Sequence, residues 1–257
     1  METHLLIHEV ARMIDHALLH PTLTDAEMRE GCQTARRYNV ASVCIKPYAI
    51  RLAVDELRGS DVRVGTVIGF PSGSHAIAVK VAETIDACQN GAVEIDMVVN
   101  IGKVLADDWA YVHDEIAAVH QACRAYNALL KVIFETDYLP ENRFITRLCE
   151  ICTTVGVDYV KTSTGFGFVK GPDGRYSYKG ATLPHLRLML AHVGPGVGVK
   201  ASGGIRTLDE LLEARALGVG RIGTSATVTI LEEAYRRFGQ GTDSPRDPIA
   251  EPDNRGY

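Results

Sequence analysis

VDYVKTSTG at residues 157–165 and VGVKASGG at residues 197–204 are two apolar, β-branched runs, each with a lysine near its end followed by small residues. Such runs are typical of buried strands in a parallel sheet. Similar runs recur along the chain with longer amphipathic segments between them, which is the pattern of βα units. The sequence therefore predicts an α/β fold with Lys161 and Lys200 near the ends of two strands.

This alternation predicts eight strands and eight helices. The strands are expected at residues 14–19, 42–46, 62–68, 93–99, 130–135, 158–162, 197–201 and 221–224. The helices are expected at residues 25–37, 47–57, 75–89, 107–126, 141–154, 183–192, 207–217 and 225–238. Eight such pairs in about 240 residues match a single-domain (β/α)8 TIM barrel. A doubly wound open sheet is the alternative, but no G-x-G-x-x-G motif follows the first strand.

The two ends of the chain are expected to lie outside the barrel, which is assigned to residues 14–238. Residues 1–13 are predicted to form a helical extension. Residues 239–257 contain three prolines, three glycines and few apolar side chains, so they are predicted to form a flexible tail. The terminal Tyr257 either hangs in solvent or swings back to a site.

Composition narrows the class of protein. With 257 residues, 46% of them hydrophobic, the chain can bury a large core. Its 27 basic and 32 acidic residues are mixed, so no basic stripe favours nucleic acid or a membrane surface. The start does not resemble a signal peptide, and no run approaches the roughly 18 apolar residues of a membrane span. Six cysteines without the density of a disulfide framework indicate a cytoplasmic protein with reduced thiols.

The two strand lysines point to amine chemistry. Desolvation disfavours an ammonium, and a second ammonium nearby disfavours it again. A lysine with the ordinary pKa of about 10.4 is free amine in roughly one molecule in a thousand near pH 7, whereas a pKa of about 7 frees roughly half. One of Lys161 and Lys200 is therefore predicted to be a nucleophile. In the alternative interpretation both side chains merely extend into solvent.

Other reactive side chains are predicted at the strand ends, where barrels build their active sites. They are Asp15, Cys44, Lys46 and Asp96. Alternation in the run VEIDMVV puts Asp96 on the same face as Glu94, and a carboxylate inside a barrel needs a cationic partner. Asp96 either forms an ion pair that only stabilises the barrel or moves protons for a lysine amine.

Two glycine-containing turns predict a phosphate site. Gly203 and Gly204 follow the seventh strand, and Gly223, Thr224 and Ser225 end the eighth, where barrels often bind phosphate. Glycines let backbone N–H groups approach an anion, and Ser225 lies at a predicted helix start. A phosphorylated small molecule is therefore the expected partner. The C-x-x-C of Cys149 and Cys152 lies inside a predicted helix, and no second cysteine or histidine pair at metal spacing accompanies it, so no metal is expected.

These motifs resemble the deoxyribose-phosphate aldolase family of class I, Schiff-base aldolases. The resemblance rests on KTSTG at 161–165, VKASGGIR at 199–206, EIDMV at 94–98 and SVCI at 42–45, and it extends in order over nearly the whole chain. It implies a (β/α)8 barrel that needs no metal or cofactor and forms a homodimer. It also implies reversible cleavage of 2-deoxy-D-ribose 5-phosphate to acetaldehyde and D-glyceraldehyde 3-phosphate.

The resemblance also implies roles for individual residues. Lys161 would form the Schiff base, Lys200 would tune its pKa, and Asp96 would join the proton transfer. The phosphate would be held by Thr164, Gly165, Gly203, Gly204, Thr224 and Ser225, with Asp15, Cys44 and Lys46 lining the pocket. Some family members end in a tyrosine that assists proton transfer, so Tyr257 is a candidate for that role.

Two features depart from the family pattern. Residues 166–179 are about ten residues longer than expected, and they are predicted to form a loop over the mouth of the site. Its Lys170, Arg175 and Lys179 either reach an anionic substrate or keep the loop soluble. Lys46 stands where a tyrosine or asparagine is expected. These departures leave open a related Schiff-base barrel, transaldolase-like or acting on keto acids, and a barrel that binds a sugar phosphate without turning it over.

Overall fold

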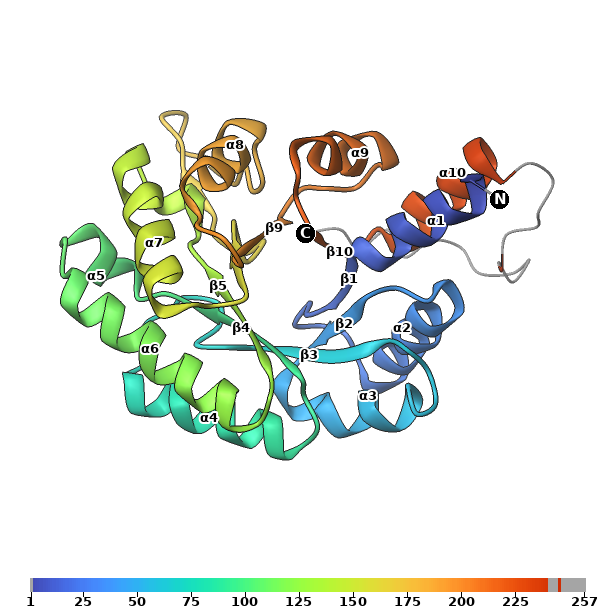
Figure 1. Cartoon of the computed structure of the whole chain (residues 1–257), viewed down its shortest axis with the longest axis horizontal. Helices are drawn as coiled ribbons and strands as arrows, with labels where there is room; N and C mark the ends of the chain where they lie inside the picture. Colours follow the sequence, from blue (N-terminus) through green and yellow to red (C-terminus); the bar gives the residue numbers. More distant parts are fainter. Residues whose placement is uncertain (1, 240–244, 246–257) are drawn as a thin grey trace.

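The chain forms a closed barrel of eight parallel strands in a computed structural model that describes residues 2–239 and residue 245 (Figure 1). The strands are β1 (Ile14–Leu18), β2 (Ser42–Ile45), β3 (Arg63–Ile68), β4 (Glu94–Val98), β5 (Leu129–Ile133), β6 (Tyr159–Lys161), β9 (Gly198–Ser202) and β10 (Arg221–Thr224). β1 pairs with β10, with Ile14 opposite Ile222, so the sheet has no free edge. The predicted barrel is confirmed, and the open sheet is excluded.

Helices surround the barrel as the amphipathic segments predicted. They are α2 (Asp25–Tyr38), α3 (Ile50–Glu56), α4 (Ile77–Gln89), α6 (Trp109–Ala125), α7 (Asn142–Val155), α8 (Leu183–His192), α9 (Leu208–Leu217) and α10 (Thr227–Phe238). Short helical turns η1 (Pro47–Ala49), α5 (Ile101–Leu105) and η2 (Thr136–Tyr138) follow β2, β4 and β5. Reciprocal capping boxes, Thr24 with Glu27 and Thr207 with Glu210, fix the starts of α2 and α9.

The strands divide their side chains between an apolar shell and a charged interior. On β4, Ile95 and Met97 belong to the main hydrophobic core, while Glu94 and Asp96 make their ion pairs with cations from other strands of the barrel. All four side chains are fully buried. The two-residue period of a strand therefore places this pair of carboxylates inside the barrel, as the sequence predicted.

A helix precedes the first strand. α1 (Glu2–Met13) lies beside α10 (Figure 1), and Ile7, Val10 and Ala11 join the hydrophobic core. Arg12 at its end donates to the carbonyl oxygen of Val40, 2.7 Å away, just before β2 begins. α1 therefore ends at the amino-terminal end of the barrel, opposite the strand ends that carry the lysines.

The long segment after β6, which the sequence predicted as a loop, contains a short hairpin. β7 (Val169–Lys170) pairs antiparallel with β8 (Tyr176–Ser177). A tight turn closes it, in which the Gly171 N–H donates to the Arg175 carbonyl at 2.8 Å and the Asp173 carboxylate accepts the Arg175 N–H at 3.1 Å. Gly174 in this turn has φ +77°, a backbone conformation that glycine adopts without strain.

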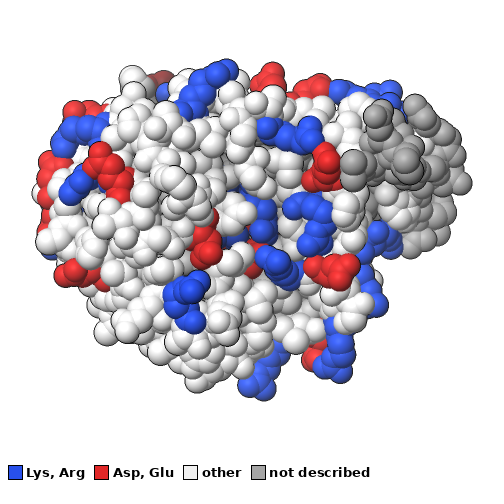
Figure 2. Space-filling model, viewed as in Figure 1, with Lys and Arg blue, Asp and Glu red and all other residues white. Residues whose placement is uncertain are grey.

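Charges of both signs are mixed over the face of the molecule in Figure 2, and basic side chains are among those around the central hollow. None of the described helices combines the length and the apolar character that crossing a bilayer requires.

Candidate active site

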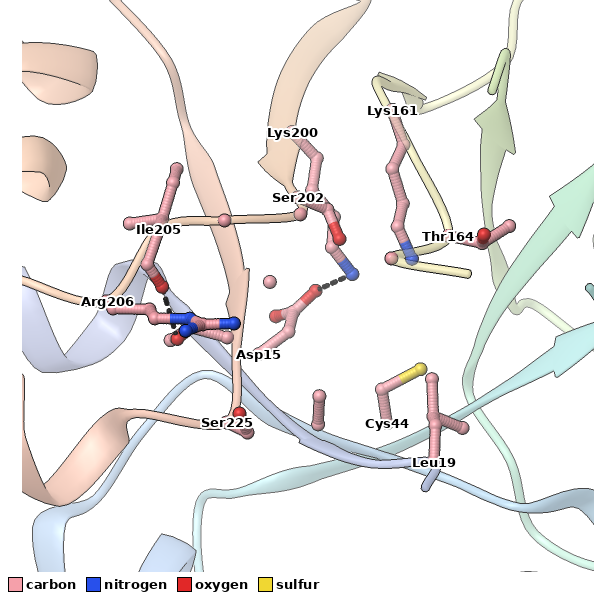
Figure 3. A pocket seen from close by; sticks show the side chains of 16 residues that line it. Asp15, Leu19, Cys44, Lys161, Thr164, Lys200, Ser202, Ile205, Arg206 and Ser225 are labelled. Carbon is pink, nitrogen blue, oxygen red and sulfur yellow. Dashed lines mark hydrogen bonds and ion pairs between the residues drawn. The ribbon is translucent and has the colours of Figure 1, made fainter. Parts of the chain in front are cut away.

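Neighbouring strands bring two lysines side by side. Lys161 on β6 and Lys200 on β9 are partners in the strand register, and they are 2% and 1% exposed. Their Nζ atoms lie 2.8 and 2.7 Å from the same carboxylate oxygen, Oδ2 of Asp96 on β4. Figure 3 shows both lysines extending toward one pocket. The sequence singled out all three residues, and the fold brings them into contact.

Further buried charges lie beneath this trio. Lys131 on β5 lies 2.8 Å from Oδ1 of Asp96 and 2.7 Å from Oε2 of Glu94. Arg221 on β10 pairs with Asp15 and, at 2.7 Å, with Glu94. Lys131 was not among the predicted site residues, although a lysine inside the run LLKVI carries the same signal as the other two. Arg221 is the first residue of its strand, where an arginine is unremarkable.

Electrostatics distinguish the three lysines. Burial lowers the pKa of each, but in Lys131 and Lys200 the adjacent carboxylates outweigh it and raise the pKa above its usual value. In Lys161 burial dominates, and Lys200 opposes the effect of Asp96, so the pKa falls below its usual value. The carboxylates Asp15, Glu94 and Asp96 are also buried, yet the neighbouring cations hold their pKa values down. Lys161 is therefore the lysine of the three that most readily becomes a free amine.

A pocket opens above the two lysines at the carboxyl ends of the strands, enclosing about 530 Å³ counted with its open mouth (Figure 3). Eleven of the residues singled out from the sequence line it: Asp15, Cys44, Lys161, Thr164, Gly165, Lys200, Gly203, Gly204, Gly223, Thr224 and Ser225. Arg206, which the sequence analysis quoted only as part of a motif, lines it as well. The pocket therefore combines a reactive amine at its floor with a cation and glycine turns at one wall.

The two threonines of the pocket use their hydroxyls within the protein. Thr164 donates to Glu135 and accepts the Phe166 N–H at 2.9 Å. Thr224 donates to the Ile205 carbonyl at 2.7 Å and accepts the Ala226 N–H at 3.0 Å. These hydroxyls shape the turns of the wall, so their hydrogen atoms are not available to an anion in this arrangement.

Lys46 requires a correction, because it does not line the pocket. Its Nζ donates to the carbonyl oxygen of Leu23 at 2.6 Å and lies 5.7 Å from the ring centre of Tyr48. β2 ends at Ile45, so Lys46 no longer follows the alternation that turns Cys44 toward the pocket. Tyr257, the candidate from the tail, lies outside the described residues.

Comparison with known proteins decides the family. The family model described as "DeoC/LacD family aldolase" matches residues 9–226. The chain belongs to the DeoC/LacD family of aldolases. The resemblance inferred from the lysine motifs is thereby confirmed, and so is the class of enzyme.

Relatives of this DeoC/LacD aldolase align over nearly its whole length. The deoxyribose-phosphate aldolase of Rhodopirellula baltica is 48% identical over 232 residues, 90% of this chain and 92% of that protein. The deoxyribose-phosphate aldolase of Thermococcus kodakarensis is 44% identical over 228 residues, 88% of this chain and 97% of that protein.

Two solved structures support the same assignment. A putative deoxyribose-phosphate aldolase from Coccidioides immitis superposes with a TM-score of 0.81 at 36% identity, covering 88% of this chain and 86% of that one. The deoxyribose phosphate aldolase of Aeropyrum pernix, described as tetrameric, gives a TM-score of 0.76 at 30% identity, covering 88% and 91%.

The inserted hairpin of this DeoC/LacD aldolase contacts the wall that carries Arg206. The Arg206 guanidinium donates to the Tyr178 hydroxyl at 3.4 Å. The Ala181 N–H donates to the Gly203 carbonyl at 3.0 Å, and a Cβ added at Gly180 would lie 2.4 Å from that oxygen. The hairpin base and the glycine turn therefore touch backbone to backbone, and the hairpin borders the pocket.

Proposed function

We propose that this aldolase reversibly cleaves 2-deoxy-D-ribose 5-phosphate to acetaldehyde and D-glyceraldehyde 3-phosphate through a Schiff base on Lys161. The observation that carries the proposal is the arrangement of Lys161, a buried amine with a lowered pKa at the floor of a pocket, against Asp96 and Lys200. Relatives at 44–48% identity carry the name deoxyribose-phosphate aldolase. A protein that only bound a sugar phosphate would need no lysine of this kind.

The chemistry follows from the charges. The Lys161 amine adds to the aldehyde carbon of the open-chain sugar, and loss of water gives the iminium. Removal of the C3 hydroxyl proton breaks the C2–C3 bond, releases D-glyceraldehyde 3-phosphate and leaves an enamine. Protonation of C2 and hydrolysis release acetaldehyde. The lowered pKa of Asp96 and the raised pKa of Lys200 keep a carboxylate and an ammonium beside the reacting amine, and we assign the proton transfers to these two groups.

The opposite end of the pocket is suited to the phosphate. Arg206 supplies a guanidinium, which can bind phosphate oxygens in a bidentate manner. Gly203 and Gly204 have φ values of +94° and +83°, which only glycine adopts readily, and Gly165 and Ser225 complete this wall. Thr164 and Thr224 would contribute by shaping the turns. Asp15 and Cys44 would line the sugar side.

Borohydride trapping tests the Schiff base. Wild-type protein, treated with acetaldehyde and borohydride, is expected to carry one ethyl group on Lys161 in peptide mass spectrometry. Lys161→Met should lose this adduct, whereas Lys170→Met, which removes an exposed lysine on the hairpin, should keep it. Adducts spread over surface lysines, with none on Lys161, would contradict the proposal.

The setting of the enzyme is also proposed. We infer that it works in the cytoplasm as a homodimer, without metal or cofactor, with residues 14–238 as the catalytic barrel between the extension 1–13 and the tail 239–257. All six cysteines are free thiols, as in a reducing compartment. Because the Aeropyrum pernix relative is described as tetrameric, light scattering at several concentrations should decide the subunit number. Tyr257 is proposed as a proton relay, which truncation before residue 257 would test.

A further inference from the structure

Seven buried charged residues form one continuous ion-pair network under the pocket, which we call the charge layer. Its carboxylates are Asp15, Glu94 and Asp96, and its cations are Lys131, Lys161, Lys200 and Arg221. None of these side chains is more than 8% exposed. With every group ionised, the layer would hold four positive and three negative charges. A buried network with one uncompensated charge is costly, so one cation is under pressure to lose its proton.

The contacts show how that pressure reaches Lys161. Among the described residues, Lys161 has Asp96 as its one ion-pair partner. Asp96 is shared with Lys131 at 2.8 Å and Lys200 at 2.7 Å. The strength of the ion pairs that these two lysines form with Asp96 depends on their other ion-pair partners. Arg221 binds the same partners.

Those other partners are Glu94 and Asp15. Lys131 lies 2.7 Å from Glu94, and Lys200 lies 2.6 Å from Asp15. Arg221 forms ion pairs with both of these carboxylates, and its Nε donates to Asp15 at 2.8 Å. Because Arg221 partly neutralises Asp15 and Glu94, Lys131 and Lys200 interact more strongly with Asp96. The attraction between Asp96 and Lys161 is therefore weaker.

We propose that Arg221 and Glu94, which do not line the pocket, are positioning residues that set the protonation state of Lys161 through the charge balance of this layer. The inference rests on the proposed function only in taking Lys161 as the reactive amine. It assigns a role in the reaction to the first residues of β10 and β4, whose side chains do not reach the pocket surface.

Other groups around the layer are few. They are Ser42 and Cys44 on β2, Arg63 on β3, Glu135 after β5 and Tyr159 on β6. Burial raises the pKa of the Cys44 thiol to about 11, so it adds no charge at neutral pH. Arg63 lies 3.4 Å from Glu94 but is 52% exposed, so solvent screens its charge. Arg63 therefore provides a control, since it touches the same carboxylate from outside the layer.

Two substitutions should shift the pKa of Lys161 in opposite directions. Glu94→Gln leaves two carboxylates against four cations. Lys131 then pairs more strongly with Asp96, Asp96 stabilises the Lys161 ammonium less, and the pKa of Lys161 should fall by about one unit. Arg221→Met leaves three carboxylates against three cations. Asp96 then stabilises the Lys161 ammonium more, and the pKa of Lys161 should rise by about one unit. The double variant restores an excess of one cation and should return the pKa to within about 0.3 units of wild type. Arg63→Met should stay within about 0.3 units.

The measurement is competitive labelling of amines with acetic anhydride over a pH series, with the extent of labelling at Lys161 read by peptide mass spectrometry. It reports the pKa of Lys161 without requiring turnover, so a wrong substrate assignment would leave the result intact. Circular dichroism confirms that each variant is folded. The pH dependence of borohydride trapping with acetaldehyde then shows whether Schiff-base formation shifts with it.

The outcomes separate a charge-balance role from a merely structural one. Opposite shifts in the two single variants, cancelled in the double variant, support the proposal. Unchanged values in folded variants, or shifts in the same direction, overturn it. If Arg221→Met does not fold, the isosteric Glu94→Gln decides alone, and a pKa of Lys161 equal to wild type in that variant refutes the proposal.

Discussion

Glu135, a buried residue absent from the sequence-based site, has a protonation equilibrium near neutrality. It lies just after β5 with φ +56° and is 1% exposed. Its carboxylate accepts the Thr164 N–H at 3.3 Å and the Thr164 hydroxyl. Burial raises its pKa to about 7, an effect that outweighs these hydrogen bonds. The turn that carries Thr164 into the pocket wall is therefore held by a group that titrates at physiological pH.

This pKa predicts a pH-dependent stability. The folded-state pKa lies above the unfolded value of about 4.3, so the folded protein binds more protons between the two values. The free energy of unfolding should then fall by about 3 kcal/mol as pH rises from 4.5 to 7. Glu135→Gln should remove this slope, as measured by urea unfolding between pH 5 and 8. Glu141→Gln, at a carboxylate 60% exposed, should keep it, and equal slopes in wild type and Glu135→Gln would contradict the assignment.

Single residues were predictable where their own strand carried the signal. Lys161, Lys200 and Asp96 stand out because each is a charge inside an apolar run. Glu135 follows such a run, but its raised pKa depends on burial against Thr164, 29 residues away along the chain, which no local pattern encodes. The prediction that Lys46 lines the pocket was wrong for a related reason, because side chains alternate between the two faces only while the strand continues.

Among the elements, the inserted hairpin is the feature that most distinguishes the mouth of this pocket. The Asp137 carboxylate anchors its base by accepting the N–H groups of Lys179 at 2.6 Å and Gly180 at 2.8 Å. The ring of Tyr178 packs edge-on against Phe168, with centroids 5.2 Å apart. From this base the Tyr178 hydroxyl meets Arg206. The hairpin therefore orients Arg206, the cation at the proposed phosphate wall of the pocket.

Tyr178→Phe should weaken binding of phosphorylated substrate and little else. Loss of a hydrogen bond worth about 0.5–1.5 kcal/mol predicts a KM for 2-deoxyribose 5-phosphate higher by about 2- to 10-fold, with kcat unchanged. Turnover of unphosphorylated 2-deoxyribose should not change, because it lacks the group that Arg206 would bind. Tyr176→Phe alters a hairpin tyrosine that is 67% exposed and should match wild type in both assays. Equal losses on both substrates would show that the hairpin does not act through the phosphate wall.

Elements were predictable in proportion to their buried area. The barrel strands and the helices around them bury apolar side chains, so apolar runs and longer amphipathic segments alternate in the sequence. β7 and β8 have two residues each, all exposed, so neither pattern could develop. Their pairing comes instead from the turn at Pro172, Asp173 and Gly174 and from the distant Asp137.

At the scale of the whole molecule, α1 packs away from the strand ends that carry the reactive lysines. β1 and β10 close the barrel, and α1 packs against α10 outside the same seam. Arg12 fastens the end of α1 to the amino-terminal ends of the strands, while Lys161 and Lys200 lie at the carboxyl ends. Barrel closure was predictable from eight strand–helix pairs, but the docking of α1 on α10 pairs helices more than 200 residues apart and has no local signal in the sequence.

This separation predicts that the packing of α1 can be weakened without changing the reaction. Ile7 on α1 is 4% exposed within the core, so Ile7→Ala should lower the free energy of unfolding by about 2–5 kcal/mol through lost burial and a residual cavity. The pocket lies at the other end of the strands, so kcat/KM at a temperature where the variant stays folded should equal that of wild type. His8→Ala, at an exposed neighbour on the same helix, should change neither quantity. A fall in kcat/KM for folded Ile7→Ala would mean that α1 and the charge layer are mechanically linked, because the ion pairs of Arg221 begin on the strand that closes this seam.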